Sequence, residues 1–408
     1  MEINADLHIH SKYSAATSNR MDMQTLAKEA AKKGIKLVGT GDCLHPKWLS
    51  EIRALESVDE GTFVVNGTHF VLTGEVEDSS QVHHLLILPS VSKAEELHER
   101  LAKHSNDITS EGRPKIFLNG EQIAQHAIEV GALIGPCHAF TPWTAIYAYF
   151  DHLSDCYGSM TEHVSFVELG LSADSDYADR IKELENLTFL TNSDAHSPWP
   201  IRLAREFNRL RVDAPTSDEV MQAILRKNNR KPVLNVGLPP EEGKYNESAC
   251  IRCYKHYTLR ECLMKKWRCA CGGIIKKGVM DRVNELADHE EPRHPDHRPP
   301  YLKLIPLAEI IAMALGVSGP NSRAVQKVWD VLIHELGDEV AVLVDADINQ
   351  LDMVDACVRD AIGQFRKGQV ILHPGGGGRY GRIELPSSNG TSTAQQKGQA
   401  QSAIFDFR

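Results

Sequence analysis

A histidine-rich, strand-like pattern opens the chain, with Asp6, His8 and His10 at alternate positions of ADLHIH. Side chains alternate across a strand, so these three share one face. Imidazole nitrogen and carboxylate oxygen suit zinc, manganese or iron. The stretch therefore predicts a metal site, although a partly exposed edge strand with incidental histidines also fits these residues taken alone.

Further polar residues stand at the ends of other apolar, strand-like runs. NSDAHS repeats the alternate spacing of the opening stretch with Asp194 and His196. The full set of candidate metal ligands is His8, His10, Asp42, Glu75, His84, His138, Asp194 and His196. His45 is a weaker candidate. His83 stays open as the alternative to His84, since adjacent strand residues do not face the same site.

Eight such ligands exceed the needs of one zinc ion, so we expect two or three divalent ions. The expected ligands of a first ion are His8, His10, Glu75 and Asp194. Those of a second ion are Glu75, His84 and His138. Asp42 and His196 are expected to hold a third ion or to orient the leaving oxygen. The carboxylates predicted to be catalytic are Asp42, Glu75 and Asp194. The ions are zinc, manganese or iron, and magnesium stays open.

Clustered ions of this kind activate water and neutralise phosphate oxygens, which predicts hydrolysis of a phosphoester or an amide.

The elements that must position the ligands are seven apolar runs separated by helical patterns over residues 1–225. The first helix is expected to begin after Asp22 and to end at Gly34. Such alternation predicts a parallel sheet covered by helices, and seven units fit a barrel better than an open sheet. In a parallel barrel, functional groups gather at the carboxyl ends of the strands, where most of these residues fall.

The motifs DLHIHS, GTGD, HHLLIL, GPCHAF and NSDAHS resemble those of the PHP (polymerase and histidinol phosphatase) superfamily. The resemblance covers about residues 1–225. It implies a distorted seven-stranded β/α barrel with a two- or three-metal phosphoesterase site. That family often has Asp-His where this chain has Asp42-Cys43, and a further histidine after the first motif is missing. The third metal position is therefore less secure than the other two.

A second cluster lies in CIRC and CAC, which place Cys250, Cys253, Cys269 and Cys271 close together in the sequence. Their spacing predicts one closed, structural zinc site with four thiolate ligands. Cys262 stays open as a replacement for Cys269 or Cys271. The glycines that follow Cys271 would supply the sharp turn.

Positive charge gathers beside these cysteines, with nine Lys or Arg residues and two acidic residues over 252–282. A basic segment with interleaved aromatic residues suits phosphate backbones and stacked bases. The predicted DNA-binding residues are Lys265, Lys266, Trp267, Arg268, Lys276 and Lys277. The alternative is a solvated face.

Composition bounds the class of protein. The 408 residues are 42% hydrophobic and 25% charged, as in ordinary globular proteins. A net charge of −10 argues against a uniformly basic coat, but not against a local basic face. No apolar run approaches the roughly 20 residues that span a bilayer, and no signal-peptide pattern is present. We therefore expect a cytoplasmic, nucleoid-associated protein with no membrane partner.

The expected domains follow from changes in composition along the chain. They are a metal-dependent unit (1–235), a linker (236–249), a zinc module (250–282), a mainly helical DNA-binding region (283–386) and a flexible tail (387–408). Four glycines at 375–378 would either approach DNA closely or form a flexible loop.

This order of parts is similar to that of the endonuclease Q family. The resemblance implies a DNA-repair endonuclease that cuts 5′ of a deaminated base (uracil, hypoxanthine or xanthine) or of an abasic site. DNA that contains deaminated bases would be its partner, and a sliding clamp stays open as another. A small-molecule phosphoesterase and an exonuclease are the alternatives. The base must be extruded into a pocket, which the sequence does not identify.

Overall fold

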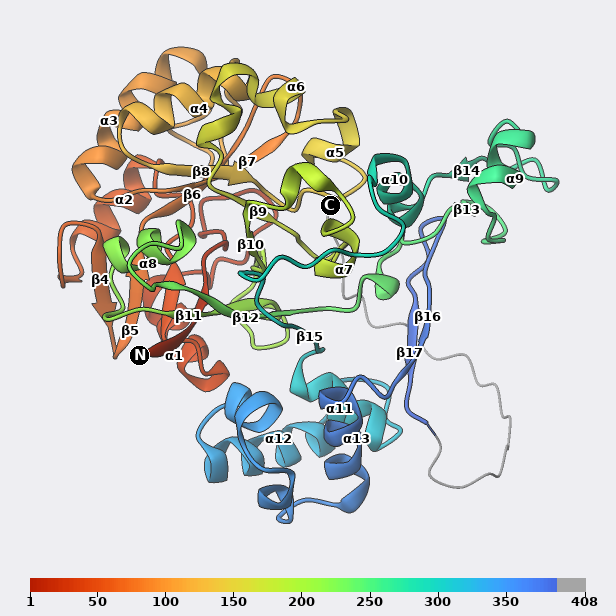
Figure 1. Ribbon diagram of the computed structural model, residues 1–408. Coiled ribbons are helices and arrows are strands. Elements are labelled where there is room, and N and C mark those ends of the chain that lie inside the picture. Colours follow the sequence, from red (N-terminus) through yellow and green to blue (C-terminus); the bar gives the residue numbers. More distant parts are fainter. Residues whose placement is uncertain (387–408) are drawn as a thin grey trace.

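The computed structural model describes residues 1–386, and the predicted flexible tail lies outside them (Figure 1). A mixed α/β body occupies the upper left of the view. A small module with the clustered cysteines projects at the right, and a group of helices lies below.

The largest sheet has eight strands in the order β15-β12-β11-β1-β2-β5-β4-β3. Its strands are Glu2–Asp6 (β1), Leu37–Gly39 (β2), Glu56–Ser57 (β3), Thr62–Val65 (β4), Thr68–Val71 (β5), Phe207–Arg211 (β11), Lys231–Gly237 (β12) and Tyr301–Lys303 (β15). β1, β2 and β5 are parallel neighbours, whereas β11 runs antiparallel to β1.

A second sheet departs from the parallel order expected from the sequence. It consists of Thr73–Glu77 (β6), His83–Ile87 (β7) and Leu133–Pro136 (β8), all antiparallel. The run HFVLTGEV is split at Leu72 into β5 and β6, which belong to different sheets. The β6–β7 connection is too short for a parallel crossover. There the Asp78 carboxylate accepts the backbone N–H groups of Ser80 and Val82.

Phe166–Glu168 (β9) and Thr188–Leu190 (β10) form a separate parallel pair. The described strands therefore do not make one closed hydrogen-bonded sheet, and a closed seven-stranded barrel is not confirmed. One buried apolar cluster nevertheless draws residues from all three sheets, including Leu7, Val71, Leu85, Phe166 and Leu190.

Helices cover the outside of these sheets. They are Met23–Lys33 (α1), Pro46–Arg53 (α2), Val91–Leu101 (α3), Gly120–Glu129 (α4), Ile146–Tyr149 (α5), Leu153–Tyr157 (α6), Ser175–Ala178 (α7) and Ser217–Ile224 (α8). The expected caps of α1 are confirmed. The Asp22 carboxylate accepts the Thr25 N–H at 2.9 Å, and Gly34 adopts a left-handed φ of 89°.

The module contains Ala249–Cys250 (β13), Leu259–Met264 (α9), Ile275–Lys276 (β14) and Val279–Leu286 (α10). The lower helices are Leu307–Ala314 (α11), Arg323–Leu336 (α12) and Ala356–Arg366 (α13). A hairpin of Ile371–His373 (β16) and Arg382–Glu384 (β17) runs between them and the module (Figure 1). Its glycines pack on the module, because a Cβ at Gly377 would lie 2.5 Å from the Cys250 carbonyl oxygen.

Candidate metal centre

His8 and His10 follow β1, and their rings converge on two carboxylates from distant parts of the chain. His10 Nε2 lies 3.1 Å from both Glu75 Oε2 and Asp194 Oδ1. His8 Nε2 lies 3.7 Å from the same two oxygens. The four predicted ligands of the first ion therefore surround one point.

Several atoms at this point are buried and lack a hydrogen-bond partner within residues 1–386. They are His8 Nε2, His10 Nε2 and Asp194 Oδ1. Buried polar atoms are normally paired, so a cluster of unpaired ones needs a further partner. Because the atoms are imidazole nitrogens and a carboxylate oxygen, a divalent metal ion fits this donor set.

Glu75 links this cluster to a second one. Its other oxygen, Oε1, lies 2.8 Å from His83 Nδ1 and 3.3 Å from His138 Nε2. The carboxylate is almost wholly buried on β6. Glu75 therefore directs one carboxylate oxygen to each cluster.

His83, rather than His84, occupies the second cluster, which corrects the choice made from the sequence. The two residues are adjacent on β7 and point to opposite faces. His84 faces away, with Nδ1 2.8 Å from the Tyr157 hydroxyl and Nε2 3.3 Å from Asp78. The apolar run that follows His84 gave no information on which of the two faces was inside.

Asp42 also differs from its expected place among the ligands. Its Oδ1 accepts from His10 Nδ1 at 3.0 Å, and its Oδ2 accepts from the Ser11 N–H and hydroxyl, both at 2.6 Å. Both oxygens are thus engaged behind His10. Asp42 fixes the ring so that Nε2 faces the cluster, a common arrangement behind metal-bound histidines.

His196 lies beside the first cluster. Its ring centroid is 4.4 Å from that of His10, and its Nδ1 is 3.0 Å from the Asp194 carbonyl oxygen. The structure does not bring it together with Asp42 as a third ion would require. No described group of mutually close ligand atoms contains either residue.

Two residues that contact the clusters were not among the candidates from the sequence. Glu168 ends β9 and accepts from His8 Nδ1 at 2.9 Å and from the His138 backbone N–H at 3.1 Å. It could have been found, since it ends an apolar run as the chosen ligands do. Arg113, which lies in the loop before α4, has no such sequence signal.

Arg113 brings positive charge to the cluster. Its Nη1 lies 3.4 Å from Glu75 Oε2, while 29% of its side chain stays exposed. The neighbouring Gly112 lets the loop pack closely against the site. A Cβ at this position would lie 2.4 Å from both Asp42 Oδ2 and Ser14 Oγ. Only glycine allows this close approach, which delivers Arg113 to the open side of the site.

The backbone is unusual at three residues of the site that follow strands. Asp42, His138 and Asp194 have φ values of 47°, 31° and 47°. This region is costly for residues with a Cβ and occurs preferentially at functional sites.

The charges of the cluster depend on one another. Burial alone would raise the pKa of Glu75, but His83, His8 and Arg113 hold it well below its ordinary value. Burial, together with the nearby His10, lowers the pKa of His196 to about 4. Glu75 is therefore ionised near pH 7, as metal ligation requires. Against the effect of burial, the surrounding carboxylates raise the pKa values of His8 and His10, so a metal ion would displace protons from these rings on binding.

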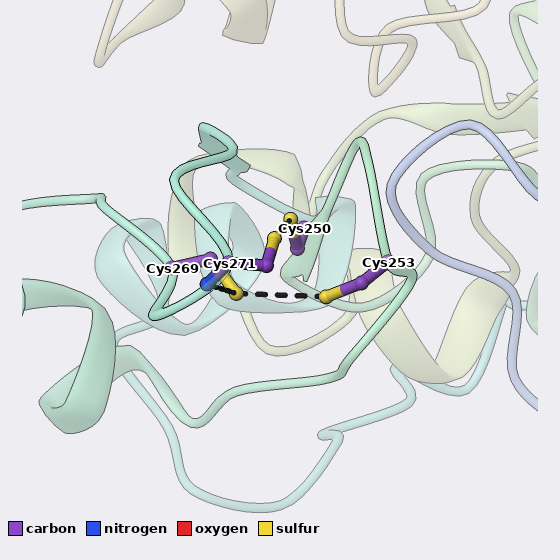
Figure 2. Close-up of side chains that lie close together, drawn as sticks. All are labelled: Cys250, Cys253, Cys269 and Cys271. Carbon is purple, nitrogen blue, oxygen red and sulfur yellow. Dashed lines mark hydrogen bonds between the residues drawn. The ribbon is translucent and has the colours of Figure 1, made fainter.

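The four predicted cysteines also come together, and Figure 2 shows their sulfur atoms facing one another. The Sγ atoms of Cys250 and Cys271, and those of Cys253 and Cys269, are 3.5 Å apart. Gly272, with φ of 83°, makes the expected turn. Cys262 packs in α9 outside this group. The four sulfurs fit a tetrahedral structural zinc.

The six predicted DNA-binding residues lie at least partly exposed on and beside the module. Two Lys–Trp contacts tie the basic residues to aromatic rings. The Lys277 ammonium lies 5.4 Å from the Trp267 ring centroid, and that of Lys276 lies 5.9 Å from the Trp143 ring centroid.

Two solved structures are similar to this chain over nearly its whole length. One is the lesion-specific endonuclease PfuEndoQ from Pyrococcus furiosus, with 50% identity, 95% of this chain and 96% of that chain covered, and a TM-score of 0.92. The other is a complex of Endonuclease Q with a 27-mer duplex substrate, with an abasic lesion at its active site. It has 49% identity, covers 95% of this chain and 97% of that one, and has a TM-score of 0.89.

The chain belongs to the endonuclease Q family. Residues 306–369 also match the family model described as the MJ0043 C-terminal domain. An uncharacterized protein of Methanocaldococcus jannaschii, MJ0043, is 47% identical over 251 residues, which cover 61% of this chain. The match spans only 31% of that relative. None of the helices in residues 1–386 is long and apolar enough to cross a membrane.

Proposed function

We propose that this endonuclease Q family member is a metal-dependent endodeoxyribonuclease of DNA repair. It hydrolyses the phosphodiester 5′ of a deaminated base or an abasic site. One observation carries the proposal: unpartnered imidazole and carboxylate atoms converge on both oxygens of Glu75 in a chain of this family. The family relatives are a lesion-specific endonuclease and a complex with damaged duplex DNA.

Two divalent ions account for the ligands that lie together. The first would be held by His8, His10, Glu75 and Asp194, and the second by Glu75, His83 and His138. Bound ions would supply Lewis-acid activation of water and of the phosphodiester. Zinc, manganese and iron all suit these ligands, and His196 is the nearest candidate for a third position.

The surrounding side chains orient this set and complement the charge of the substrate. Glu168 and Asp42 accept from the Nδ1 atoms of His8 and His10, which directs both Nε2 atoms inward, where each would give up its proton to bind an ion. If Glu75 held ions, the Arg113 guanidinium would be free to donate to a non-bridging phosphate oxygen. Arg113 would thereby stabilise the charge that grows in the transition state.

The remaining parts would bind the duplex. We keep the division into a catalytic unit (1–235), a linker (236–249), a zinc module (250–282) and a helical region (283–386). The shared apolar cluster supports a distorted PHP-like barrel for the first unit. Residues 306–369 have ten acidic and five basic side chains, so we assign most phosphate contacts to the basic module instead.

DNA that contains deaminated bases would be the main partner, which implies a cytoplasmic, nucleoid-associated enzyme. A sliding clamp is the proposed second partner. It should then increase the incision rate when the enzyme concentration is limiting. This effect is measured by adding the clamp of the same organism to the incision reaction.

An incision assay tests the proposed function. A 5′-labelled duplex with one deoxyuridine, deoxyinosine or abasic site is incubated with the protein and a divalent metal. A single nick 5′ of the lesion is expected. A ladder of products would instead indicate an exonuclease, and phosphate release from a small ester alone would indicate a phosphatase. Asp194→Asn should abolish the nick while DNA binding persists.

A further inference from the structure

Trp199 is an exposed tryptophan in the loop that joins the candidate ligand Asp194 to β11. It is 47% exposed, and a proline lies on each side of it in the chain, at positions 198 and 200. Neither metal cluster uses this residue, and it has no part in the proposed activation of water. A large ring held at the surface beside a reaction centre offers its π face to a planar ligand.

The loop around Trp199 is held at both ends. On its N-terminal side the Ser18 N–H donates to the His196 carbonyl oxygen at 2.9 Å. On its C-terminal side the buried Lys33 ammonium donates to the Pro200 carbonyl oxygen at 2.8 Å. The flanking prolines restrict the backbone further, because their rings fix φ. Since the loop is already ordered, little conformational entropy would be lost when a ligand stacks on the indole.

This loop borders the open side of the first metal cluster. The side chains of Asp194 and His196 are 11% and 20% exposed, whereas those of His8 and Glu75 are 1% exposed. A substrate therefore reaches the cluster past Asp194 and His196. Trp199 comes three residues after His196, and that length of extended chain spans at most about 11 Å. Stacked bases are about 3.4 Å apart along a strand, so Trp199 lies within a few base steps of the cluster.

We propose that Trp199 stacks on the base of the nucleotide immediately 5′ of the incision, and so positions the oxygen that leaves. The inference rests on the proposed function, in which the phosphodiester 5′ of the lesion is hydrolysed. In that step the oxygen of water forms a bond to phosphorus. The bond from phosphorus to the 3′ oxygen of the upstream nucleotide breaks, and this oxygen takes up a proton.

Stacking on this base would offset part of the cost of extruding the lesion nucleotide. An enzyme that acts at a damaged base in a duplex must take that base out of the stack. The base on the 5′ side then loses one stacking partner, while its own sugar carries the leaving oxygen and must stay beside the metals. An aromatic side chain can replace the missing partner, because every base has a π face. A purine, which has the larger face, should gain more from the indole than a pyrimidine.

The first test varies the stacked base. Single-turnover incision rates, with enzyme in excess, are measured on two deoxyuridine duplexes that differ only in having adenine or thymine 5′ of the lesion. We expect Trp199→Leu to lose about tenfold or more beside adenine and clearly less beside thymine. Trp199→Phe should keep most of the rate on both duplexes, because it retains a planar ring. A partial loss of folded protein would change both duplexes alike, so it cannot produce the expected difference.

The second test observes the base directly and does not depend on cutting. 2-Aminopurine, whose fluorescence is quenched by stacking, replaces the base 5′ of the lesion, and the duplex is bound by Asp194→Asn, in which incision is expected to be blocked. We expect fluorescence to stay low while Trp199 is present and to rise when Trp199→Leu is added to this variant. Phe117→Leu is the matched control and should change neither measurement. Phe117 is 53% exposed, but its backbone N–H donates to His104, outside the metal centre.

Several results would overturn the inference. They are an unchanged rate in Trp199→Leu, equal losses on the two duplexes, and 2-aminopurine fluorescence that stays low without the indole. A rise in fluorescence only when 2-aminopurine stands opposite the lesion would place the ring on the other strand, and would equally overturn it. A parent protein that cuts neither duplex would instead overturn the proposed function.

Discussion

Glu75 is the residue that contacts both histidine clusters of the candidate site. Its two oxygens face different histidine clusters, with His10 on one side and His83 on the other. Around them, Asp42 and Glu168 are hydrogen-bond partners that fix the direction of the rings. The ligands and their supports thus have separate tasks, and substitutions should distinguish them.

His83 and His84 should respond differently to the same substitution. We expect His83→Asn to weaken metal binding by more than about tenfold, because it removes a ligand beside Glu75. His84→Asn should lower thermal stability through loss of its bonds to Tyr157 and Asp78, with metal affinity near that of the parent. Metal content after dialysis against a graded chelator series measures the difference. A larger loss of metal from His84→Asn than from His83→Asn would contradict the assignment of His83 as the ligand.

Arg113 should affect the rate more than binding. We expect Arg113→Met to lower the single-turnover incision rate about 100-fold, as loss of one donor to a developing anion does. Arg113→Lys should recover part of it, and metal content should not change. Lys115→Met is the matched control, since Lys115 lies in the same segment but pairs with Glu77 at 2.7 Å. An Arg113→Met enzyme with parental rate and weaker DNA binding would contradict this role.

At the scale of elements, the cysteine module is the part least able to fold by itself. Its buried cluster contains only Cys250, Tyr257, Cys262, Cys269 and Ile275. So small an apolar core does not offset the entropy of ordering the segment. The metal that the four thiolates would hold is therefore expected to stabilise the module and its basic surface together.

Removal of one thiolate should consequently impair DNA binding. We expect Cys253→Ser to lose the module's zinc and to bind lesion duplex roughly tenfold or more weakly, since the basic residues lose their common support. Cys357→Ser, which changes an exposed cysteine of α13, should leave both unchanged. Zinc content and fluorescence anisotropy measure these effects. Parental DNA affinity in zinc-free Cys253→Ser would refute the structural role.

At the scale of the whole molecule, a buried ion pair joins the helical region to the α/β body. Lys33 Nζ, at the end of α1, lies 2.5 Å from Glu339 Oε1, and both side chains are almost fully buried. Glu339 also accepts from the Leu307 N–H and the Trp329 indole. An exposed pair, Arg209 with Asp345, joins the same two parts.

These two ion pairs should differ in how much they contribute to the free energy of unfolding. Glu339→Gln leaves the Lys33 charge buried without its carboxylate, which should lower the free energy of unfolding by about 3–5 kcal/mol. Asp345→Asn breaks the exposed pair and should cost less than about 1 kcal/mol. Denaturant unfolding, with proteolysis to follow release of α11–α13, measures both. Similar losses in the two variants would contradict the importance of burial.

Glu206, just before β11, should make stability depend on pH. Burial raises its pKa from 4.5 to about 8. Between these values the folded chain holds a proton that the unfolded chain has released, so stability falls as pH rises. We expect Glu206→Gln to flatten this slope by up to about 1.4 kcal/mol per pH unit. The variant should be more stable than the parent at pH 8, as thermal denaturation measures. An unchanged slope would contradict a buried, protonated Glu206.

The sequence by itself determined much of this protein. Period-two placement of His8 and His10 indicated the candidate metal cluster, because alternation in a strand is a local property. The same spacing in NSDAHS indicated Asp194, whereas His196 lies beside the cluster. Cysteine spacing likewise identified the module before its fold was known. The bounds of the first helix followed from local capping, at Asp22 and Gly34 of α1.

Only the tertiary structure decided what depends on contacts between distant segments. The two adjacent histidines of β7 cannot be distinguished from the sequence. The pairing of β7 with β6 and β8 placed His83 toward the site. Asp42 is behind His10 because Ser11 engages its second oxygen. Arg113 enters from a loop with no periodic pattern, seated by Gly112. Local propensity fixes where a side chain leaves the backbone, whereas the packing of remote elements fixes what it meets.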